Sequence, residues 1–585
     1  MKEKIENLIK EALKNLGINE EVNFSVEHPE SFVNGDYSTN VAMVCAKQLK
    51  TNPKDLANKI TKELSTRQGL VFIEKVEVAG AGFINFYLSR EYFTESVAKI
   101  LKEKENWGKN NLSIGKKIMV EYTDPNPFKP FHIGHLMTNA IGESISRIVE
   151  FSGAKIIRAN YQGDVGPHVA KAIYSILHSD KYLEVGLPNI ESVGSPTSNS
   201  KEANWIGQCY ALGSSLYDED KDAKKEIDEI NKKIYDKSDI EINKIYDWGR
   251  KITLDAFEEI YKILGTKFDY YFFESEMAVK GKEIVKENVG NIFEESDGAI
   301  IFHGENYDKK LHTRVFINSQ GLPTYETKEI GLTMAKFDKE NPDLSIVVTA
   351  TEQAEYMKVV QKAISLIHPD LERRMKHITH GMMKFKEGKM SSRKGNIITG
   401  ESLIRDSMDV VFEKVKERDL TDIEKENISR IVGVSALKYS ILKSSLGSDI
   451  VYDFEKSISF DGDSGPYLQY TAVRAKAILR KAEELQLQIT DYKLLNEIPS
   501  DVIELEHLIY QFPEIIEKSY INLEPHHITT YLTELASNFN TFYANTKILD
   551  DNNIFAIYHL DLVRAFYQTM KNGLYLLGVE TPERM

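Results

Sequence analysis

Two histidines one helical turn apart are the first residues whose type and spacing suggest chemistry. They stand in His132-Ile133-Gly134-His135, which follows Pro125-Asn126-Pro127 and opens an apolar helical pattern, so the pair lies at a helix N-terminus. Free N–H groups and the helix dipole attract phosphate at such a terminus, and Gly134 lets a flat ring approach the backbone. A single histidine there is more often a helix cap. The pair favours phosphate binding.

A cluster of cations later in the chain is the second group with chemical potential. Between Lys384 and Gly395 there are five basic residues and one acid, Glu387. The centre of this segment is Lys389-Met390-Ser391-Ser392-Arg393-Lys394. A cationic loop of this kind is suited to holding a triphosphate and to stabilising the negative charge that develops on it. Taken alone, it would be an ordinary solvated loop.

The elements that must position the histidines form a strand-loop-helix-strand unit. Strands are predicted at residues 118–122 and 155–160, and a proline-rich loop at 123–130. Between them, five apolar residues share one face of a helix that ends before Gly153: Leu136, Ala140, Ile141, Ile145 and Ile148. This unit is the building block of parallel nucleotide-binding sheets, whose ligands bind at the carboxyl ends of the strands.

Three domains are predicted from changes of pattern along the 585 residues. Residues 1–110 alternate helical patterns with β-rich runs at 71–73 and 83–87, which indicates an α+β domain. Residues 111–424 are expected to form a Rossmann-like domain with a parallel sheet. Residues 425–585 are nearly all helical in pattern and predict an α-helical bundle domain. The fold class is therefore multidomain α/β.

The central domain is expected to carry an insertion at about residues 167–310. This section is charge-dense and mostly helical in pattern, and its Ser/Pro/Gly/Asn-rich stretch at 192–200 is typical of a loop. Strand patterns return at residues 314–317 and 344–348. We expect the parallel sheet to resume there.

Composition excludes several other classes of protein. With 42% hydrophobic and 28% charged residues, the chain is globular rather than disordered. Cys45 and Cys209 are too few for a disulfide framework and lack zinc-site spacing, so no structural metal is expected. Residues 1–17 form an amphipathic pattern rather than a signal peptide, and no stretch approaches the about 18 apolar residues of a membrane span. These features predict a cytoplasmic protein.

The two chemical motifs together resemble a known family. HIGH at residues 132–135 and KMSS at 389–392 resemble the paired signatures of class I aminoacyl-tRNA synthetases. The chain is similar to arginyl-tRNA synthetases in particular, and the resemblance covers nearly its whole length. The segments that carry it are GDYSTNVA at 35–42, EYTDPN at 121–126, RANYQGD at 158–164, GPYLQY at 465–470 and PERM at 582–585.

The resemblance implies an arginine-tRNA ligase. Arginine attacks the α-phosphate of ATP, pyrophosphate leaves, and the adenylate acylates the terminal ribose of the tRNA for arginine. The substrate is its own nucleophile, so the protein supplies positioning and charge stabilisation. The implied substrates are L-arginine, tRNA and ATP with Mg²⁺.

The resemblance also assigns roles to individual residues. Those expected to stabilise the reacting phosphates are His132, His135, Lys389, Arg393 and Lys394. Those expected to bind ATP are Gly134, Gly381, Met382, Met383, Ser391 and Ser392, with adenine held by backbone groups of the 380–383 segment. Those expected to bind arginine, whose planar guanidinium requires fixed carboxylates, are Glu121, Asn126, Tyr325, Glu329 and Gln353. Those expected to contact the anticodon by stacking and charge are Tyr467, Tyr470, Arg474, Tyr543 and Met585.

Four positions in three segments depart from the family pattern. The second lysine of the usual KMSKS loop is Ser392, and Arg393 or Lys394 could take its place. Glu329 stands where the family usually has Asp, which lengthens a carboxylate arm in the arginine pocket. The DALR-type signature of the helical domain is Ser435-Ala436-Leu437-Lys438, so a fixed role for its first and last positions is in question.

The charge balance restricts where RNA can bind. Lys and Arg total 74 and Asp and Glu total 89, so the formal net charge is 74 − 89 = −15. Residues 431–585 are also net acidic, and the cations concentrate at Lys384–Lys394 and Arg474–Lys481. RNA should therefore bind along those basic segments and bind more weakly as salt is added. We expect a monomer.

Two alternatives remain to be tested. A class I synthetase for another amino acid is disfavoured because the candidate pocket is acidic rather than apolar. A non-catalytic RNA-binding scaffold would need neither HIGH nor the basic loop.

Overall fold

The computed structural model describes most of the chain: residues 1–19, 22–65, 71–182, 199–386, 398–485, 498–550 and 553–585. These residues divide into two compact units. The first contains residues 1–108, 471–515 and 532–572, and the second contains the rest of the described chain.

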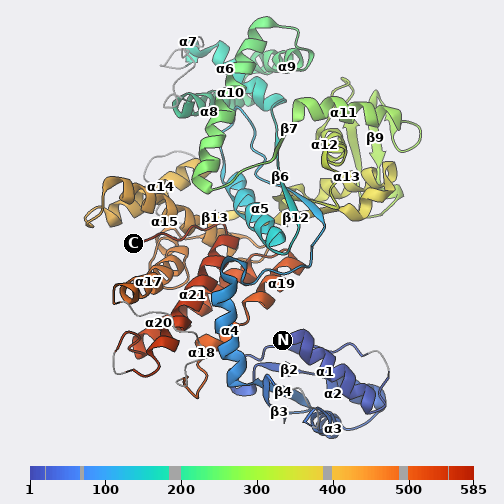
Figure 1. Cartoon of the computed structure of the whole chain (residues 1–585). Coiled ribbons are helices and arrows are strands. Elements are labelled where there is room, and N and C mark those ends of the chain that lie inside the picture. Colours follow the sequence, from blue (N-terminus) through green and yellow to red (C-terminus); the bar gives the residue numbers. More distant parts are fainter. Residues whose placement is uncertain (20–21, 66–70, 183–198, 387–397, 486–497, 551–552) are drawn as a thin grey trace. The chain divides into compact units, whose positions relative to one another are not determined.

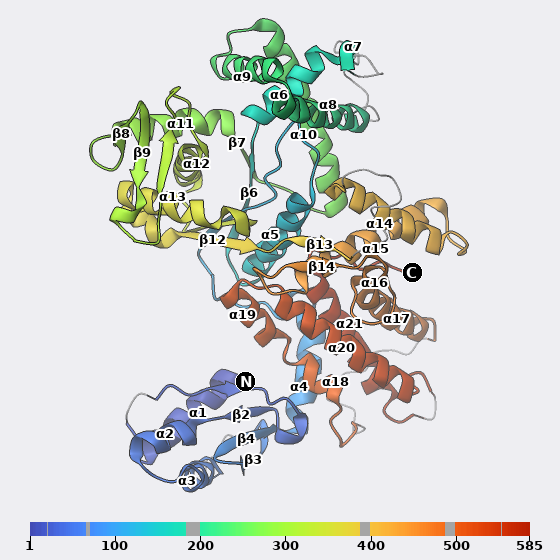
Figure 2. The same ribbon diagram turned by 180° about the vertical axis from the view of Figure 1, so that it is seen from behind.

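A five-stranded parallel sheet forms the centre of the second unit (Figures 1 and 2). Its strand order is β12-β11-β5-β6-β7, and every neighbouring pair runs parallel. The chain builds outward from β5 through β6 to β7 and then crosses to the other side of β5 to add β11 and β12. Ligands bind at such a reversal, at the carboxyl ends of the strands. The strands are β5 (Lys117–Glu121), β6 (Lys155–Gln162), β7 (Tyr270–Phe273), β11 (Leu344–Ala350) and β12 (Met375–His380).

Helices cover both faces of this sheet, as expected for parallel strands. Helix α5 (Ile133–Phe151) lies against β5, β6 and β11. On the other face, Met119 of β5 packs in one apolar cluster with Met277 of α11 (Glu274–Glu287) and Leu332 of α12 (Tyr325–Glu340). Because side chains alternate along a strand, Glu121 points to the same face as Met119. The strand register therefore aims the last side chain of β5 at α12.

Residues 314–317 do not rejoin the parallel sheet, so that part of the sequence prediction is wrong. They belong to β10 (Thr313–Ile317), in a separate antiparallel sheet of order β10-β9-β8 with β9 (Ala299–His303) and β8 (Glu294–Ser296). This sheet shares an apolar core with α11, α12 and α13 (Ala354–Ile367). The predicted strand at 344–348 is confirmed as β11.

The predicted helical insertion is mostly confirmed. Its helices pack around a core that includes Ile227, Trp248 and Ile252. They are α6 (Pro167–Leu177), α7 (Ser179–Tyr182), α8 (Asn199–Glu219), α9 (Lys221–Asp236) and α10 (Ile240–Leu264). The predicted extent is wrong at its end, because β7 is a strand of the central sheet and β8 and β9 follow. The strand β7 was not predicted, because its four residues are all aromatic and do not alternate with polar residues. Of the predicted loop, residues 192–198 lie outside the described part of the chain.

An antiparallel sheet of order β1-β2-β4-β3 lies at the N-terminal end of the first unit. Its elements are α1 (Lys2–Asn15), β1 (Val26–Glu27), β2 (Tyr37–Thr39), α2 (Val41–Leu49), α3 (Pro53–Ser65), β3 (Ile73–Ala79), β4 (Phe83–Leu88) and α4 (Arg90–Glu103). The amphipathic N-terminal helix buries Ile5, Ile9 and Leu13, as predicted. The strand predicted at 71–73 is largely wrong, since Val71 and Phe72 form a turn before β3.

The C-terminal part of the chain is almost entirely helical, as predicted. Among its described residues the one strand is β14 (Ile450–Tyr452), which pairs in parallel with β13 (Met383–Phe385). The helices are α14 (Gly400–Val415), α15 (Asp422–Leu442), α16 (Phe454–Ser457), α17 (Gly465–Glu484), α18 (Glu504–Ile509), α19 (Phe512–Asn522), α20 (His526–Asn545) and α21 (Ala556–Leu576). Among the described helices of the whole chain, none is long and apolar enough to cross a membrane.

Candidate active site

The loop between β5 and α5 carries an unusual backbone. Thr123, Asp124 and Phe128 have positive φ values of 82°, 48° and 68°. Such conformations are costly for residues with side chains and persist where the surroundings hold them. Asn139 donates to Oγ1 of Thr123 at 2.9 Å, and the Tyr161 N–H donates to Oδ1 of Asp124 at 2.8 Å. Neighbouring elements thus fix this loop at the carboxyl end of the sheet.

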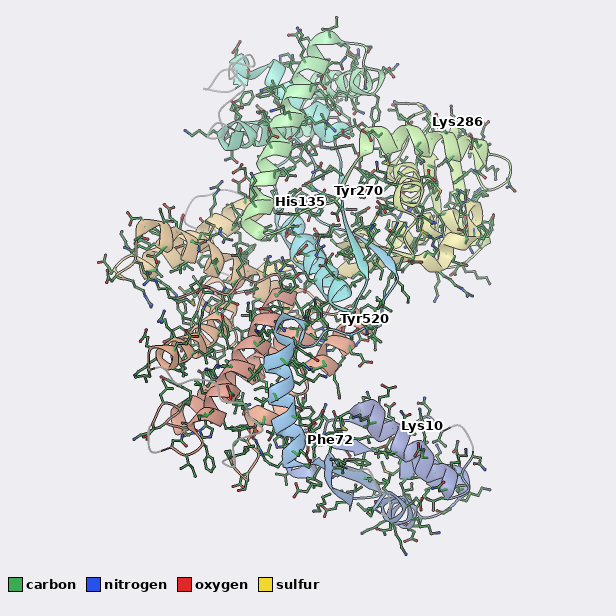
Figure 3. All side chains as sticks on the ribbon, in the orientation of Figure 1. Lys10, Phe72, His135, Tyr270, Lys286 and Tyr520 are labelled. Carbon is green, nitrogen blue, oxygen red and sulfur yellow. The ribbon has the colours of Figure 1, made fainter. Side chains whose placement is uncertain are left out.

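His132 and His135 form a reciprocal cap at the start of α5, where Figure 3 labels His135. The His135 N–H donates to Nδ1 of His132 at 3.4 Å, and the His132 N–H donates to Nδ1 of His135 at 3.3 Å. The two rings stack, and a Cβ on Gly134 would lie 2.9 Å from the His132 ring. Burial, with His132 and Lys129 nearby, lowers the pKa of His135 well below its usual value. Neutral imidazoles therefore stand at a helix terminus that attracts anions.

Three carboxyl groups and one lysine meet beside this loop; we call them the carboxyl cluster. Glu121 and Lys336 form an ion pair, and each side chain is only 2% exposed. Burial and the charge of Glu121 raise the pKa of Asp124 well above its usual value. The same two causes raise the pKa of Glu329 to about 8. The electrostatic interactions place Glu121, Asp124, Glu329 and Lys336 in one buried group.

Asn126 lies where the ends of three strands converge. A Cβ on Gly163, directly after β6, would lie 2.1 Å from Oδ1 of Asn126 and 3.4 Å from Cδ of Glu274, the first residue of α11 after β7. Gly163 is thus required by the close approach of the Asn126 side chain. The contact brings Asn126 to the carboxyl edge of β5, β6 and β7.

Tyr325 is the first residue of α12 and is 61% exposed. Nζ of Lys328 lies 5.1 Å from the centre of its ring and 2.9 Å from Oε2 of Glu274. Although burial opposes it, Glu274 raises the pKa of Lys328. This buried ion pair supports the tyrosine at the edge of the site. Gln353 lies in the short 3-10 helix Thr351–Gln353 after β11 and is exposed.

The 380–383 segment is held to β14 by its backbone. The Met382 N–H donates to Oδ1 of Asp449 at 2.9 Å, and its carbonyl oxygen accepts the Ile450 N–H at 2.8 Å. A Cβ on Gly381 would lie 2.3 Å from the carbonyl oxygen of Ser448. The Met382 side chain is half exposed, so it is the side chain that this segment presents outward. Met383 begins β13.

The predicted triphosphate loop falls mainly outside the described residues. This applies to Lys389, Ser391, Ser392, Arg393 and Lys394. Two cations of the same segment are described. Lys384 pairs with Asp449 at 2.6 Å and Lys386 with Asp453 at 3.1 Å. These two ammonium groups are therefore partly neutralised by acids of the helical region.

Two of the five candidate anticodon residues are in direct contact. The Arg474 guanidinium of α17 lies 5.3 Å from the centre of the Tyr543 ring of α20 and also donates to Oδ1 of Asn540. Tyr543 is 43% exposed, so its ring reaches the surface beside the Arg474 guanidinium. Stacked aromatic and cationic groups of this kind suit unpaired bases.

The other three anticodon candidates are placed differently. Tyr467 and Tyr470 lie on α17, and Tyr470 meets the edge of Phe460. The Met585 side chain packs against an apolar cluster of α14 and α15 that includes Val411 and Ile428. Packing therefore accounts for Met585 without RNA.

Four functional candidates were missed from the sequence: Asp124, Glu274, Lys328 and Lys336. For Lys336 the sequence offered one usable signal, because Glu329, Thr333 and Lys336 recur on one face of α12. This face lines a small cavity toward β11 and α13. The remaining three meet their partners only through the tertiary fold.

One group of described residues has spacing that could hold a metal ion. Ligand atoms of Glu524, His526 and His527 lie within 4.8 Å of one another. Oε2 of Glu524 lies 3.3 Å from Nε2 of His527, a distance that a hydrogen bond also explains. The active-site candidates do not include this group.

Comparison with family models covers nearly the whole chain. The model for the catalytic domain of class I tRNA synthetases (R) matches residues 96–454, and the arginyl tRNA synthetase N terminal domain matches residues 3–88. The DALR anticodon binding domain matches residues 468–585. The chain belongs to the arginyl-tRNA synthetase family. The resemblance inferred from the motifs is thereby confirmed.

Relatives named arginine–tRNA ligase match this family member end to end. The enzyme from Halothermothrix orenii is 30% identical, over 100% of this chain and 99% of its own. That from Clostridium perfringens is 31% identical, over 97% of this chain and 98% of its own.

Solved structures of the family share the fold. Thermus thermophilus arginyl-tRNA synthetase superposes with a TM-score of 0.77 at 21% identity, covering 100% of both chains. The Plasmodium falciparum arginyl-tRNA synthetase gives 0.75 at 20% identity, covering 100% of this chain and 99% of that one. These similarities confirm the predicted fold class of a parallel-sheet catalytic domain with an N-terminal α+β domain and a C-terminal helical domain.

Proposed function

We propose that the chain is an arginine-tRNA ligase that activates L-arginine with ATP and transfers it to the terminal ribose of its tRNA. The observation that carries the proposal is the carboxyl cluster beside the α5 terminus. An acidic buried pocket suits a guanidinium, whereas an apolar amino acid would leave its carboxylates without a partner. The neighbouring helix N-terminus suits a polyphosphate.

Arginine binds in this proposal with its side chain toward Glu121 and Glu329. A guanidinium matches carboxylate oxygens with paired N–H donors. The exposed ring of Tyr325 flanks the side chain, and Asn126 meets the substrate backbone. Gln353, after β11, completes the pocket on the other side of β5.

The α5 terminus then receives the phosphates of ATP. His132 and His135, both neutral, donate N–H groups to phosphate oxygens, and the helix dipole stabilises the charge that develops. Gly134 allows the close approach. Mg²⁺ enters with ATP as part of the substrate, and the 389–394 segment, with Ser391, Ser392, Lys389, Arg393 and Lys394, holds the leaving pyrophosphate.

Adenine is placed near the 380–383 segment. Because the Met382 N–H already donates to Asp449, we assign adenine contact to the exposed Met382 side chain and to the backbone around Gly381 and Met383. Packing of a flat base against a flexible thioether needs no backbone donor.

Anticodon recognition is assigned to the helical part of the chain. Arg474 and Tyr543 form one stacking platform. Tyr467 and Tyr470 of α17 are proposed as further base contacts. Met585 packs against α14 and α15. The proposed domain boundaries remain 1–110, 111–424 and 425–585, and we propose a cytoplasmic monomer.

Amino-acid-dependent exchange of pyrophosphate into ATP tests the activity. It should require arginine and should be measured with and without tRNA, because the family typically needs tRNA for activation. Exchange with cysteine or leucine but not with arginine would refute the assignment. Binding of tRNA without any exchange would instead indicate a non-catalytic RNA-binding protein.

A further inference from the structure

Lys336 is the only described lysine that forms an ion pair with a carboxyl group of the cluster. It lies on α12, two turns after Glu329, and its side chain is 2% exposed. A lysine is buried to this extent only when it is paired, because an isolated buried ammonium loses its hydration without compensation. Its partner is Glu121, the last residue of β5. The pair therefore joins α12 to the strand end that faces the substrate.

The cluster has fewer cations than carboxyl groups. Lys336 supplies one positive charge to Glu121, Asp124 and Glu329. If all three carboxyls were ionised, the buried group would carry a net charge of 1 − 3 = −2. Like charges at close range in a region of low dielectric cannot all ionise together. Burial and Glu121 accordingly raise the pKa of both Asp124 and Glu329.

The groups that face the cluster from other elements do not change this balance. Glu274 of α11 is paired with Lys328, and Glu326 of α12 lies 3.4 Å from Arg314 of β10. Tyr161 of β6 and Tyr356 of α13 are neutral, since burial raises the pKa of both well above the usual value. A further cation is therefore accommodated only if it enters as a ligand.

We propose that Lys336 is a positioning residue for arginine recognition: its ammonium fixes the Glu121 carboxylate at the end of β5 and neutralises only part of the cluster, so that the guanidinium of arginine completes the charge balance. This inference rests on the proposed ligase function. Lys336 acts through Glu121 and does not need to touch the substrate. When the substrate binds, a protonated carboxyl group of the cluster must lose its proton.

The expected pH dependence follows from the sign of the charge change. Below about pH 8 the empty pocket holds a proton on Glu329, where burial and Glu121 raise its pKa to about 8. A guanidinium favours the ionised carboxylate and stays protonated itself throughout this range. Arginine binding therefore releases a proton below pH 8, and the KM for arginine should rise as pH falls, by up to about tenfold per pH unit.

Replacing Lys336 should move this profile. In Lys336→Met the cluster loses its cation, so its carboxyl groups hold protons more tightly and the midpoint of the KM profile shifts to higher pH. Lys336→Arg keeps the charge and should keep the midpoint. Lys339→Met is the matched control, because Lys339 lies on the same helix but is exposed. A residue needed only for packing would lower stability without shifting a midpoint.

The experiment measures aminoacylation at saturating ATP and tRNA, with the KM for arginine and kcat determined separately from pH 6.5 to 9. An upward shift in Lys336→Met that Lys336→Arg reverses supports the proposal, and an unchanged midpoint overturns it. If Lys336→Met does not fold, Lys336→Gln, which can still donate to Glu121, replaces it. If neither folds, a wild-type KM that is flat with pH overturns the proposal and one that falls toward pH 8 supports it. Failure of arginine-dependent exchange at every pH would instead refute the proposed function.

Discussion

The Nζ of Lys438, in the middle of the helical region, donates a hydrogen bond of 2.6 Å to the carbonyl oxygen of Leu264, the last residue of α10. The same Nζ donates at 2.7 Å to the carbonyl oxygen of Gly578, just beyond α21. The last carbonyls of a helix have no partner within it. One buried lysine of α15 thus caps the end of α10 and holds the segment that follows α21, which gives the last position of the DALR-type signature a structural role.

Stability should depend on pH through Lys438. Burial lowers the pKa of this ammonium from 10.5 to about 7, so the folded chain loses the proton at a pH where the unfolded chain keeps it. Between pH 7 and 10.5 the unfolded state binds more protons, and stability therefore rises with pH, by up to about 1.4 kcal/mol per unit. In Lys438→Met this contribution disappears and two buried carbonyls lose their donor, at about 1–3 kcal/mol each.

Thermal unfolding from pH 7 to 9 measures this effect. The difference in Tm between wild type and Lys438→Met should widen as pH rises. Lys443→Met is the control, since Lys443 directly follows α15, is 39% exposed and forms a surface pair with Asp463. That variant should change stability by less than about 1 kcal/mol. A constant Tm difference across this pH range would contradict the assignment.

The sequence predicted the parts of the fold that are coded locally. The alternation and spacing around residues 118–160 identified β5, α5 and β6, because each is long and periodic. The same reasoning misplaced residues 314–317, since a strand pattern does not specify which sheet it joins. The short aromatic strand β7 was missed for a related reason: its place is set by pairing with the distant strand β6, where Tyr270 lies opposite Ala159.

The motifs predicted several residues of the candidate site, but they did not predict the lysine that compensates the charge of its carboxylates. His132, Glu121 and Asn126 lie in local motifs, and the fold brings them to one end of the sheet. For Lys336 the sequence offered only its spacing from Glu329, because an ammonium on a helix is usually solvated and only the tertiary structure shows its pairing with Glu121. Similarly, the sequence predicted a cationic segment suited to a triphosphate, and only the structure shows that Lys384 pairs with Asp449 and Lys386 with Asp453.

His132 should be needed for chemistry beyond its capping role. Asn is an effective N-cap, so His132→Asn preserves the helix start and removes the imidazole. We expect kcat for aminoacylation to fall by about 100-fold or more, with the Tm nearly unchanged, because the donor to the reacting phosphates is lost. Pyrophosphate exchange and thermal unfolding are the measurements.

His135→Ala provides the companion test. Aminoacylation should fall by orders of magnitude while tRNA binding changes little. For the first variant, His132→Asn, normal turnover would show that capping is the whole function of His132.

The first unit contains a buried ion pair that should be important for its stability. Arg90 of α4 donates to the two carboxylate oxygens of Glu506 at 2.9 and 2.5 Å, and the Glu506 side chain is 2% exposed. Arg90→Met would leave this carboxylate buried without its cation, which costs about 3–5 kcal/mol. We expect the Arg90→Met variant to unfold at a lower temperature than wild type. Thermal unfolding and limited proteolysis are the measurements.

The double variant Arg90→Met with Glu506→Leu separates charge from packing. Removing both charges should recover a large part of the lost stability. Lys99→Met is the control on α4, where Lys99 is 60% exposed. If the double variant is less stable than the single one, the unpaired charge is not the cause.

Tyr543 should contribute to tRNA binding through its exposed ring, which lies under the Arg474 guanidinium. Stacking of one base on an aromatic side chain contributes about 1–3 kcal/mol, so Tyr543→Ala should raise the KM for tRNA by about 5- to 150-fold at constant salt. Tyr543→Phe keeps the ring and should stay close to wild type. The KM values for arginine and ATP should not change, because the pocket lies in the second unit. The matched control is Tyr307→Ala. It removes a ring of similar exposure, 46%, that is stacked on Phe302. Equal effects of Tyr543→Ala and Tyr307→Ala on tRNA binding would remove Tyr543 from the RNA-binding surface.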